Sequence, residues 1–189
     1  MFILAAPIFS ILYPKGNAQE GVPMLATFGI AVILYAVVSV TGIPAAGTEQ
    51  AVASGLKMTV RYTDPAGKPI AVDTLSRGRD FKAVVTVTNT GSAAAEHLAL
   101  AQKFPSGWEI RNDRLGREDY SYPAGITYQD FRDDRVYTFF DLPAGQSVTV
   151  TTGLTATYPG RFYLPAVRCE AMYDDTVTAL VPGRWTEVK

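Results

Sequence analysis

The sequence predicts an all-β protein, a β-sandwich built from many short strands. About nine segments alternate β-branched or aromatic residues with polar residues, which is the period of a half-buried strand. Glycine and proline separate these segments, as they do in sandwich proteins. No segment repeats its apolar residues with a helical period over more than about two turns.

Length and charge narrow the class of protein. A chain of 189 residues is typical of one domain with an appendage. It carries 17 basic and 18 acidic residues, a net charge of −1. Neither a basic field for nucleic acid nor an acidic field for a cationic partner is therefore expected.

The apolar N-terminal segment, residues 1–45, has three interpretations. Met24–Ile43 is an uncharged run of about twenty residues, long enough to span a bilayer, and Phe2–Tyr13 resembles a poor signal peptide. Val32–Val40 is rich in β-branched residues, so it also fits a buried strand of a preceding domain. In the third interpretation the chain is a fragment, and residues 1–30 have no native partner.

A domain boundary is expected at Ile43–Thr48, where proline and small residues form a linker, so residues 46–189 are predicted to be the β-sandwich domain. The expected strands are 56–62, 81–87, 98–102, 136–142, 148–152, 162–164, 167–173, 176–180 and 185–188, with a short extended piece at 108–110. Residues 64–67 and 142–146 have turn chemistry. Residues 93–97 are expected to form a turn, and residues 111–124 a polar loop.

The most informative stretch is Tyr128–Leu142. Its second half places Val136, Thr138, Phe140 and Leu142 on one face of a strand. Its first half is predicted to be a charged loop with two interpretations. Either Arg–Asp pairs hold the loop at a sheet edge, or planar guanidiniums make it a docking surface for carboxylates. The residues involved are Asp130, Arg132, Asp133, Asp134 and Arg135.

Several motifs together resemble one family. Tyr128–Leu142, Gly160–Pro165 and Cys169–Asp174 are similar to the last domain of bacterial-type alpha-2-macroglobulins, and Leu34–Tyr35 with Thr41–Ala45 resembles the segment that leads into it. The resemblance runs from Leu34 to the C-terminus. Alpha-2-macroglobulins are very large protease traps, so this chain would contain only their tail.

The resemblance implies an immunoglobulin-like sandwich with additional strands. It also implies a non-catalytic C-terminal domain of an endopeptidase inhibitor, which packs on and shields a thioester supplied by upstream domains. Those domains would be its partners and proteases would be met only indirectly, in the periplasm or outside the cell. Met172 and Tyr173 match the position of the aromatic that covers the thioester. The alternative is that Tyr173 is an ordinary interface or core aromatic.

A second function from another class fits the N-terminal segment. The chain would then be a membrane-anchored sandwich, an interaction or adhesion module without inhibitory activity, and Met24–Ile43 would be its anchor in the cell envelope.

Enzymatic and cofactor chemistry are not expected. His97 is the single histidine and has no serine elbow near it in the sequence, so a catalytic triad is disfavoured. The acidic pairs Asp133–Asp134 and Asp174–Asp175 are too few for calcium, and neighbouring strand residues point to opposite faces. Cys169 lacks the glutamine of a Cys-x-x-Gln thioester unit and is expected to be a small buried hydrophobe. We therefore expect no metal, no cofactor and no enzyme.

Overall fold

The computed structural model describes residues 45–112 and 122–189, and these residues form strands and turns without a helix. They belong to one compact unit, Pro44–Lys189. The expected apolar segment and most of the polar loop at 111–124 lie outside the described residues. Within the described ranges, no helix has the length and apolar character needed to cross a membrane.

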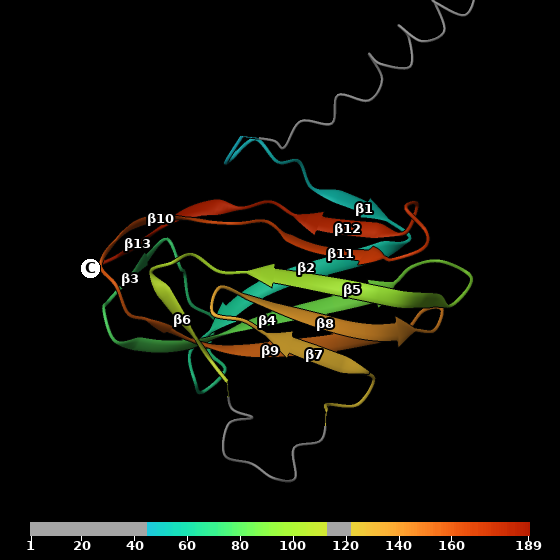
Figure 1. The fold of residues 1–189 in the computed structure, drawn as a ribbon, viewed down its shortest axis with the longest axis horizontal. Coiled ribbons are helices and arrows are strands. Elements are labelled where there is room, and N and C mark those ends of the chain that lie inside the picture. The colour runs from blue at the N-terminus through green and yellow to red at the C-terminus, as the bar shows by residue number, and fades with distance from the viewer. Residues whose placement is uncertain (1–44, 113–121) are drawn as a thin grey trace, which may run out of the picture. The chain divides into compact units, whose positions relative to one another are not determined.

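Three sheets make up the described fold (Figure 1). The six-stranded sheet contains, in spatial order, β1 (Val52–Ser54), β12 (Thr178–Val181), β11 (Val167–Ala171), β5 (Ala95–Lys103), β8 (Arg135–Leu142) and β7 (Tyr128–Phe131). The four-stranded sheet contains β2 (Leu56–Thr63), β4 (Arg79–Asn89), β9 (Ser147–Ala156) and β6 (Trp108–Arg111). The three-stranded sheet contains β10 (Gly160–Leu164), β13 (Arg184–Val188) and β3 (Thr74–Leu75). The prediction of an all-β sandwich is confirmed.

The strands differ from the expected ones in two informative places. Residues 128–131 are strand β7 rather than a charged loop, because Phe131 pairs with Val136 in an antiparallel hairpin. Residues 95–97 belong to strand β5 rather than to a turn, through a bulge between Ala95 and Leu98. Neither short segment has an alternation long enough to reveal a strand.

Alternation along the longer strands builds the core between the two main sheets. The expected inward face of β8 is confirmed, because Val136, Thr138, Phe140 and Leu142 are all buried. The apolar residues form two clusters, one that includes Leu100, Phe140 and Val150 and one that includes Phe104, Val136 and Leu154.

A polar belt crosses the core between these clusters. Gln102, Thr138 and Thr152 are the inward residues between the two clusters on β5, β8 and β9, and each is at most 2% exposed. Thr152 Oγ1 donates to Gln102 Oε1 at 3.2 Å, a hydrogen bond from one main sheet to the other. Gln129 Nε2 donates to Thr138 Oγ1 at 3.0 Å within the six-stranded sheet.

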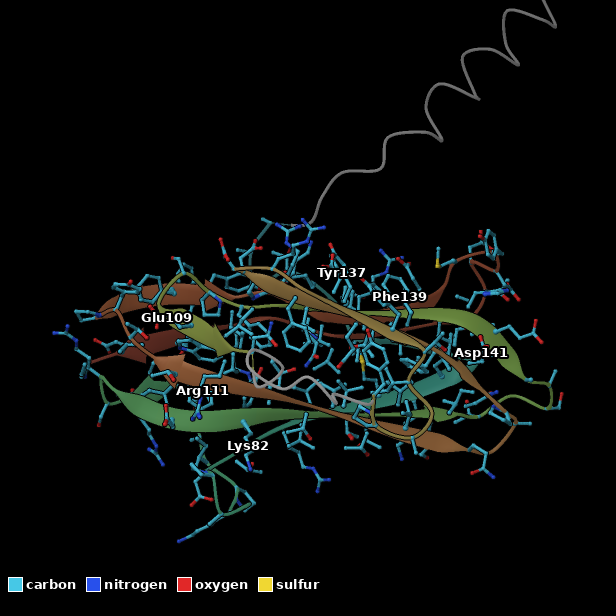
Figure 2. The ribbon with its side chains drawn as sticks, turned by 60° about the horizontal axis from the view of Figure 1, so that its bottom comes forward. Lys82, Glu109, Arg111, Tyr137, Phe139 and Asp141 are labelled. Carbon is cyan, nitrogen blue, oxygen red and sulfur yellow. The ribbon has the colours of Figure 1, made fainter. Side chains whose placement is uncertain are left out.

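The outer faces of the two main sheets differ in chemistry. Figure 2 labels outward side chains of both: Lys82 of β4 with Glu109 and Arg111 of β6, and Tyr137, Phe139 and Asp141 of β8. The four-stranded sheet adds a hydrogen-bonded polar ladder, in which Thr86 pairs with Thr149 at 3.1 Å. The six-stranded sheet instead stacks Tyr128 on Phe139, with ring centroids 6.1 Å apart.

We predict that residues 46–189 fold without the N-terminal segment, because both apolar clusters lie within them. Far-UV circular dichroism of the isolated piece should show a strand-dominated spectrum and a cooperative thermal transition. A helix-dominated or non-cooperative signal would contradict the prediction.

The polar belt generates a second prediction. Thr152→Val should lower the free energy of unfolding by about 1–3 kcal/mol, because it leaves the buried Gln102 carbonyl without its partner. The double variant Gln102→Leu/Thr152→Val removes both partners and should recover most of that loss. Urea unfolding of Thr152→Val, Gln102→Leu and the double variant measures the coupling free energy between the two side chains. Additive losses would show that the hydrogen bond does not couple the sheets.

Candidate functional site

The first candidate site is the Arg–Asp hairpin, residues 130–135, between β7 and β8. Arg132 N donates to Arg135 O at 2.9 Å and closes the turn. Phe104 N donates to Asp134 O at 2.8 Å, which attaches the turn to the chain just beyond β5. One backbone hydrogen bond therefore closes the turn, and a second attaches it to the chain that follows β5.

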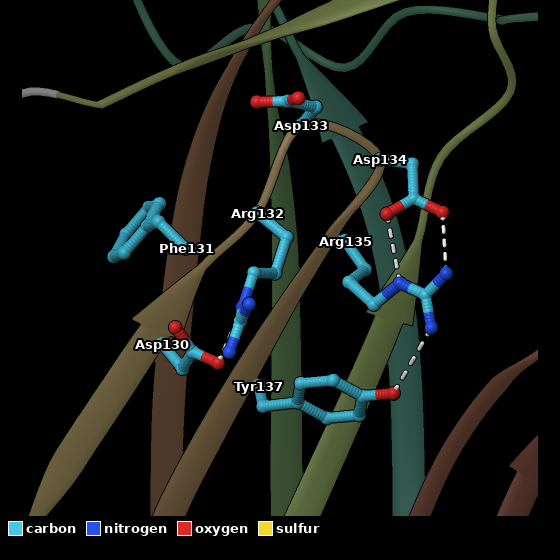
Figure 3. Close-up of a pocket in the computed structure, with 7 residues that line it drawn as sticks. All are labelled: Asp130, Phe131, Arg132, Asp133, Asp134, Arg135 and Tyr137. Atoms are coloured by element: carbon cyan, nitrogen blue, oxygen red, sulfur yellow. Dashed lines mark hydrogen bonds and ion pairs between the residues drawn. The ribbon is translucent and has the colours of Figure 1, made fainter.

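The side chains of the hairpin are paired with one another (Figure 3). Arg135 Nε and Nη2 donate to the two carboxylate oxygens of Asp134, both at 2.7 Å, and Nη1 donates to the Tyr137 hydroxyl at 3.5 Å. Arg132 Nε donates to Asp130 Oδ2 at 2.8 Å. The hydrogen bonds from Arg135 lower the pKa of Asp134. Among the described residues Asp133 forms no ion pair.

This pairing favours the structural interpretation over docking. A guanidinium recognises an external carboxylate through its planar fork, but the fork of Arg135 is already filled by Asp134. The Arg135 side chain is 38% exposed and that of Arg132 is 66% exposed. Exposed pairs of this kind stabilise a fold only weakly. We infer that the hairpin braces the start of β8.

The second candidate site is the Tyr173 turn, residues 171–177, between β11 and β12. Ala171 N donates to Val177 O at 3.0 Å and closes the base of the turn. Asp174 Oδ1 accepts hydrogen bonds from Thr176 N at 3.0 Å and from Thr176 Oγ1 at 2.6 Å. These bonds hold the far side of the turn and lower the pKa of Asp174.

The turn presents two large apolar side chains to solvent. Tyr173 is 82% exposed and Met172 is 55% exposed. Tyr173 lines two hollows: one includes Ala99, Arg168 and Glu170, and the other includes Ala94 and Glu96. Tyr173 is therefore not a core aromatic. Of the two ordinary roles considered for it, interface or core, only the interface role remains.

His97 supports the exposed tyrosine. The two rings meet edge to face, with centroids 5.4 Å apart and planes at 90°. His97 has a φ of 53°, a left-handed conformation that is uncommon outside glycine, at the bulge in β5. The backbone N–H of His97 donates to Asp141 Oδ1 at 2.6 Å, and the backbone carbonyl of His97 accepts from Met172 N at 3.0 Å. The bulge thus holds the imidazole ring against the phenol.

The sequence disfavours His97 as a catalytic residue and does not indicate its position beside Tyr173. No pattern in residues 93–97 signals a bulge, because the run is alanine-rich and lacks the glycine that usually marks one. The pairing with Tyr173 joins residues 76 positions apart and becomes visible only in the register of β11 with β5.

The two candidate sites are separate. Ala171 pairs with Leu98 near the start of β5, whereas Arg135 pairs with Lys103 at its end. Five strand residues at about 3.4 Å each place them roughly 17 Å apart along the sheet.

The single cysteine is buried away from both candidate sites and is not a reactive thiol. Cys169 is buried, and burial raises the pKa of its thiol to about 12, so it is protonated at neutral pH. Within residues 45–112 and 122–189, no group of three histidine, cysteine, aspartate or glutamate side chains could hold a metal ion.

An antiparallel β-sandwich with a supported, exposed aromatic turn is the class of protein that these residues define. The family profile described as the bacterial alpha-2-macroglobulin MG10 domain matches residues 55–175. This chain belongs to that family.

Individual relatives agree with the family profile. Alpha-2-macroglobulin of Pasteurella multocida is 26% identical over 144 residues, which cover 75% of this chain. Native alpha-2-macroglobulin of Escherichia coli, in a structure from domain MG7 to the C-terminus, superposes with a TM-score of 0.68 at 21% identity, covering 78% of this chain and 25% of that one. The trypsin-activated Escherichia coli protein superposes with a TM-score of 0.66 at 21% identity, covering 75% of this chain and 11% of that one.

The chain is much shorter than these relatives. It spans 7% of the Pasteurella multocida protein, 8% of the Yersinia pestis homologue and 9% of the Xylella fastidiosa protein. The family therefore identifies the domain.

The hairpin geometry predicts a small and graded effect on stability. Arg135→Ala should lower the urea midpoint slightly, because it removes three hydrogen bonds of a partly exposed side chain. Arg132→Ala should lower it less, and Asp133→Ala, the matched control without an ion pair, should leave it unchanged. A large loss for Arg132→Ala would contradict the assignment of weak, exposed pairs.

Proposed function

We propose that this chain is the non-catalytic C-terminal domain of an alpha-2-macroglobulin-like endopeptidase inhibitor. In this proposal the domain packs on the thioester region of the same protein and shields the thioester from water with Tyr173 and Met172. Membership of the MG10 domain family supports the first part. The observation that carries the second part is the exposed Tyr173, whose ring meets that of His97 edge to face.

The Tyr173 turn has the properties of a surface that becomes buried in a larger assembly. Exposed aromatics scattered singly need no explanation, but here Tyr173 and Met172 are adjacent, in a turn held by the Ala171 N to Val177 O backbone bond and by the bond from Thr176 N to the Asp174 side chain. Preorganisation of this kind lowers the entropic cost of association. A tyrosine buries roughly 150–250 Å² when it is covered, and its hydroxyl can find a polar partner at the same time.

The chemistry to be protected explains why an aromatic fits the role. A thioester hydrolyses when water reaches its carbonyl, so its lifetime depends on a dry pocket. A phenol ring excludes water over a broad area and has few rotatable bonds. The left-handed backbone at His97 is a local strain, and such strain is often retained where a functional side chain must be positioned.

The partners in this proposal are other domains of the parent protein, and proteases are met only indirectly. One relative is described as trypsin activated, which associates a relative of this domain with a protease response. The cell envelope is the proposed location, as it is for the inhibitor family that the motifs resemble.

The proposal is tested in the complete inhibitor by Tyr173→Gly. Without the ring, water should reach the thioester, and free thiol should appear before any protease is added at a rate about tenfold higher or more, equivalent to about 1.4 kcal/mol of lost protection per factor of ten. Tyr158→Gly is the matched control, because Tyr158 is 54% exposed and lies between β9 and β10 rather than in the Tyr173 turn. Thiol titration over time gives both rates.

A second variant separates the ring from its support. His97→Gly removes the imidazole and accepts the left-handed backbone, so the fold should remain intact while Tyr173 loses its edge contact. Thiol release should then be intermediate. Equal release in the Tyr173→Gly protein and the unmodified protein, both folded, would eliminate the shielding role.

A further inference from the structure

The segment that leads into the sandwich, residues 45–51, is folded onto itself. Thr48 N and Thr48 Oγ1 both donate to Ala45 O, at 2.9 and 2.7 Å, and close a turn. Gly47 lies within this turn with a φ of 87°, a conformation that glycine adopts without strain. Beyond it, β1 pairs with β12 at the edge of the six-stranded sheet (Figure 1). The closed turn is shorter than the same residues in extended form.

One side chain of the sandwich holds this turn in place. The Tyr163 hydroxyl, from β10, accepts a hydrogen bond from Gly47 N at 2.8 Å and donates to Glu49 Oε2. Glu49 Oε2 also accepts from Gly47 N at 3.1 Å. The bond from Tyr163 lowers the pKa of the Glu49 carboxyl, while burial and then Glu49 raise the pKa of the tyrosine. Neutral pH therefore keeps the proton on the donor and the charge on the acceptor.

Neighbouring residues of the sandwich hold the Tyr163 ring in one position. Tyr163 pairs across the strands with Trp185, and their ring centroids are 5.5 Å apart. The guanidinium of Arg161 covers the Trp185 ring at 4.7 Å from its centroid, a cation–π contact. Gly183 leaves the space beneath the phenol, since a Cβ there would lie 2.5 Å from Leu164 O and would also clash with the Tyr163 ring. These contacts fix the ring and aim its hydroxyl at residues 47–49.

We propose that Tyr163 is a latch, which keeps residues 45–51 as a closed turn and releases them as a tether. Only a few hydrogen bonds hold the turn closed, most of them exposed and the one between Tyr163 and Glu49 partly buried, so the turn opens without disturbing either apolar cluster. Seven residues reach at most about 25 Å when extended. Release would thus lengthen the segment that precedes β1 while every strand stays paired. The latch is independent of thioester shielding, and its test requires no thioester.

The test uses the full 189-residue chain and limited digestion by elastase, which cleaves after small residues such as Ala45, Ala46 and Ala51. Cleavage within residues 45–51 should be faster when the turn is open, so a change in its rate reports a change in the open population. Tyr163→Phe removes both hydroxyl hydrogen bonds and retains the ring against Trp185. It should speed cleavage within residues 45–51 about tenfold, as judged from fragment masses. Tyr158→Phe is the matched control and should not change it.

Glu49→Gln makes the test independent of the sandwich, because Glu49 lies outside every strand. It keeps the shape of the acceptor and removes its charge, so cleavage within residues 45–51 should also accelerate, by a smaller factor. Unchanged cleavage in the Glu49→Gln protein would overturn the latch whatever Tyr163→Phe does to the fold. Unchanged cleavage in a folded Tyr163→Phe protein would overturn it as well.

Discussion

Hydrogen bonds between the two main sheets align the molecule, and the rest of the structure depends on that alignment. Apolar packing is non-directional, so by itself it permits one sheet to slide over the other. The Thr152–Gln102 bond opposes such sliding inside the core, because displacement would strand a buried carbonyl. Near one end, Asn89 Nδ2 donates to Leu142 O at 2.9 Å and to Ala93 O at 2.8 Å. Two directed contacts at different points along the sheets fix both position and rotation.

The alignment of the two sheets also positions the Tyr173 turn, where function is proposed. Asn89 also accepts at its side-chain oxygen from Gly91 N at 2.8 Å, so one buried amide organises the connection from β4 to β5. That connection leads directly into the bulge at His97, and β8 supplies the Asp141 carboxylate that receives the His97 N–H. A series of contacts thus connects the buried Asn89 with His97, and His97 with the exposed Tyr173. A mobile loop could carry the same residues but could not hold them in one orientation.

Sequence periodicity predicted the sandwich because its longer strands bury every second residue, and β8 and β9 have eight and ten residues over which that period can repeat. It missed β1, since three residues contain no period. The Arg–Asp hairpin was expected as a loop because its charge hid a short edge strand, although its charged residues were singled out. His97 and Tyr163 could not have been identified as partners of Tyr173 and Glu49. Their contacts depend on strand register and on a bulge, which local sequence does not encode.

The burial of Cys169 has a practical consequence. It is the single cysteine of the chain, it has no measurable exposure, and its thiol is protonated at neutral pH. A thiol reagent in solution therefore does not react with Cys169 as long as the six-stranded sheet stays intact. The same reagent would react once β11 separates from β5 and β12, which flank it. The chain thus contains its own reporter of sheet opening, with no label to introduce and no second thiol to confuse the signal.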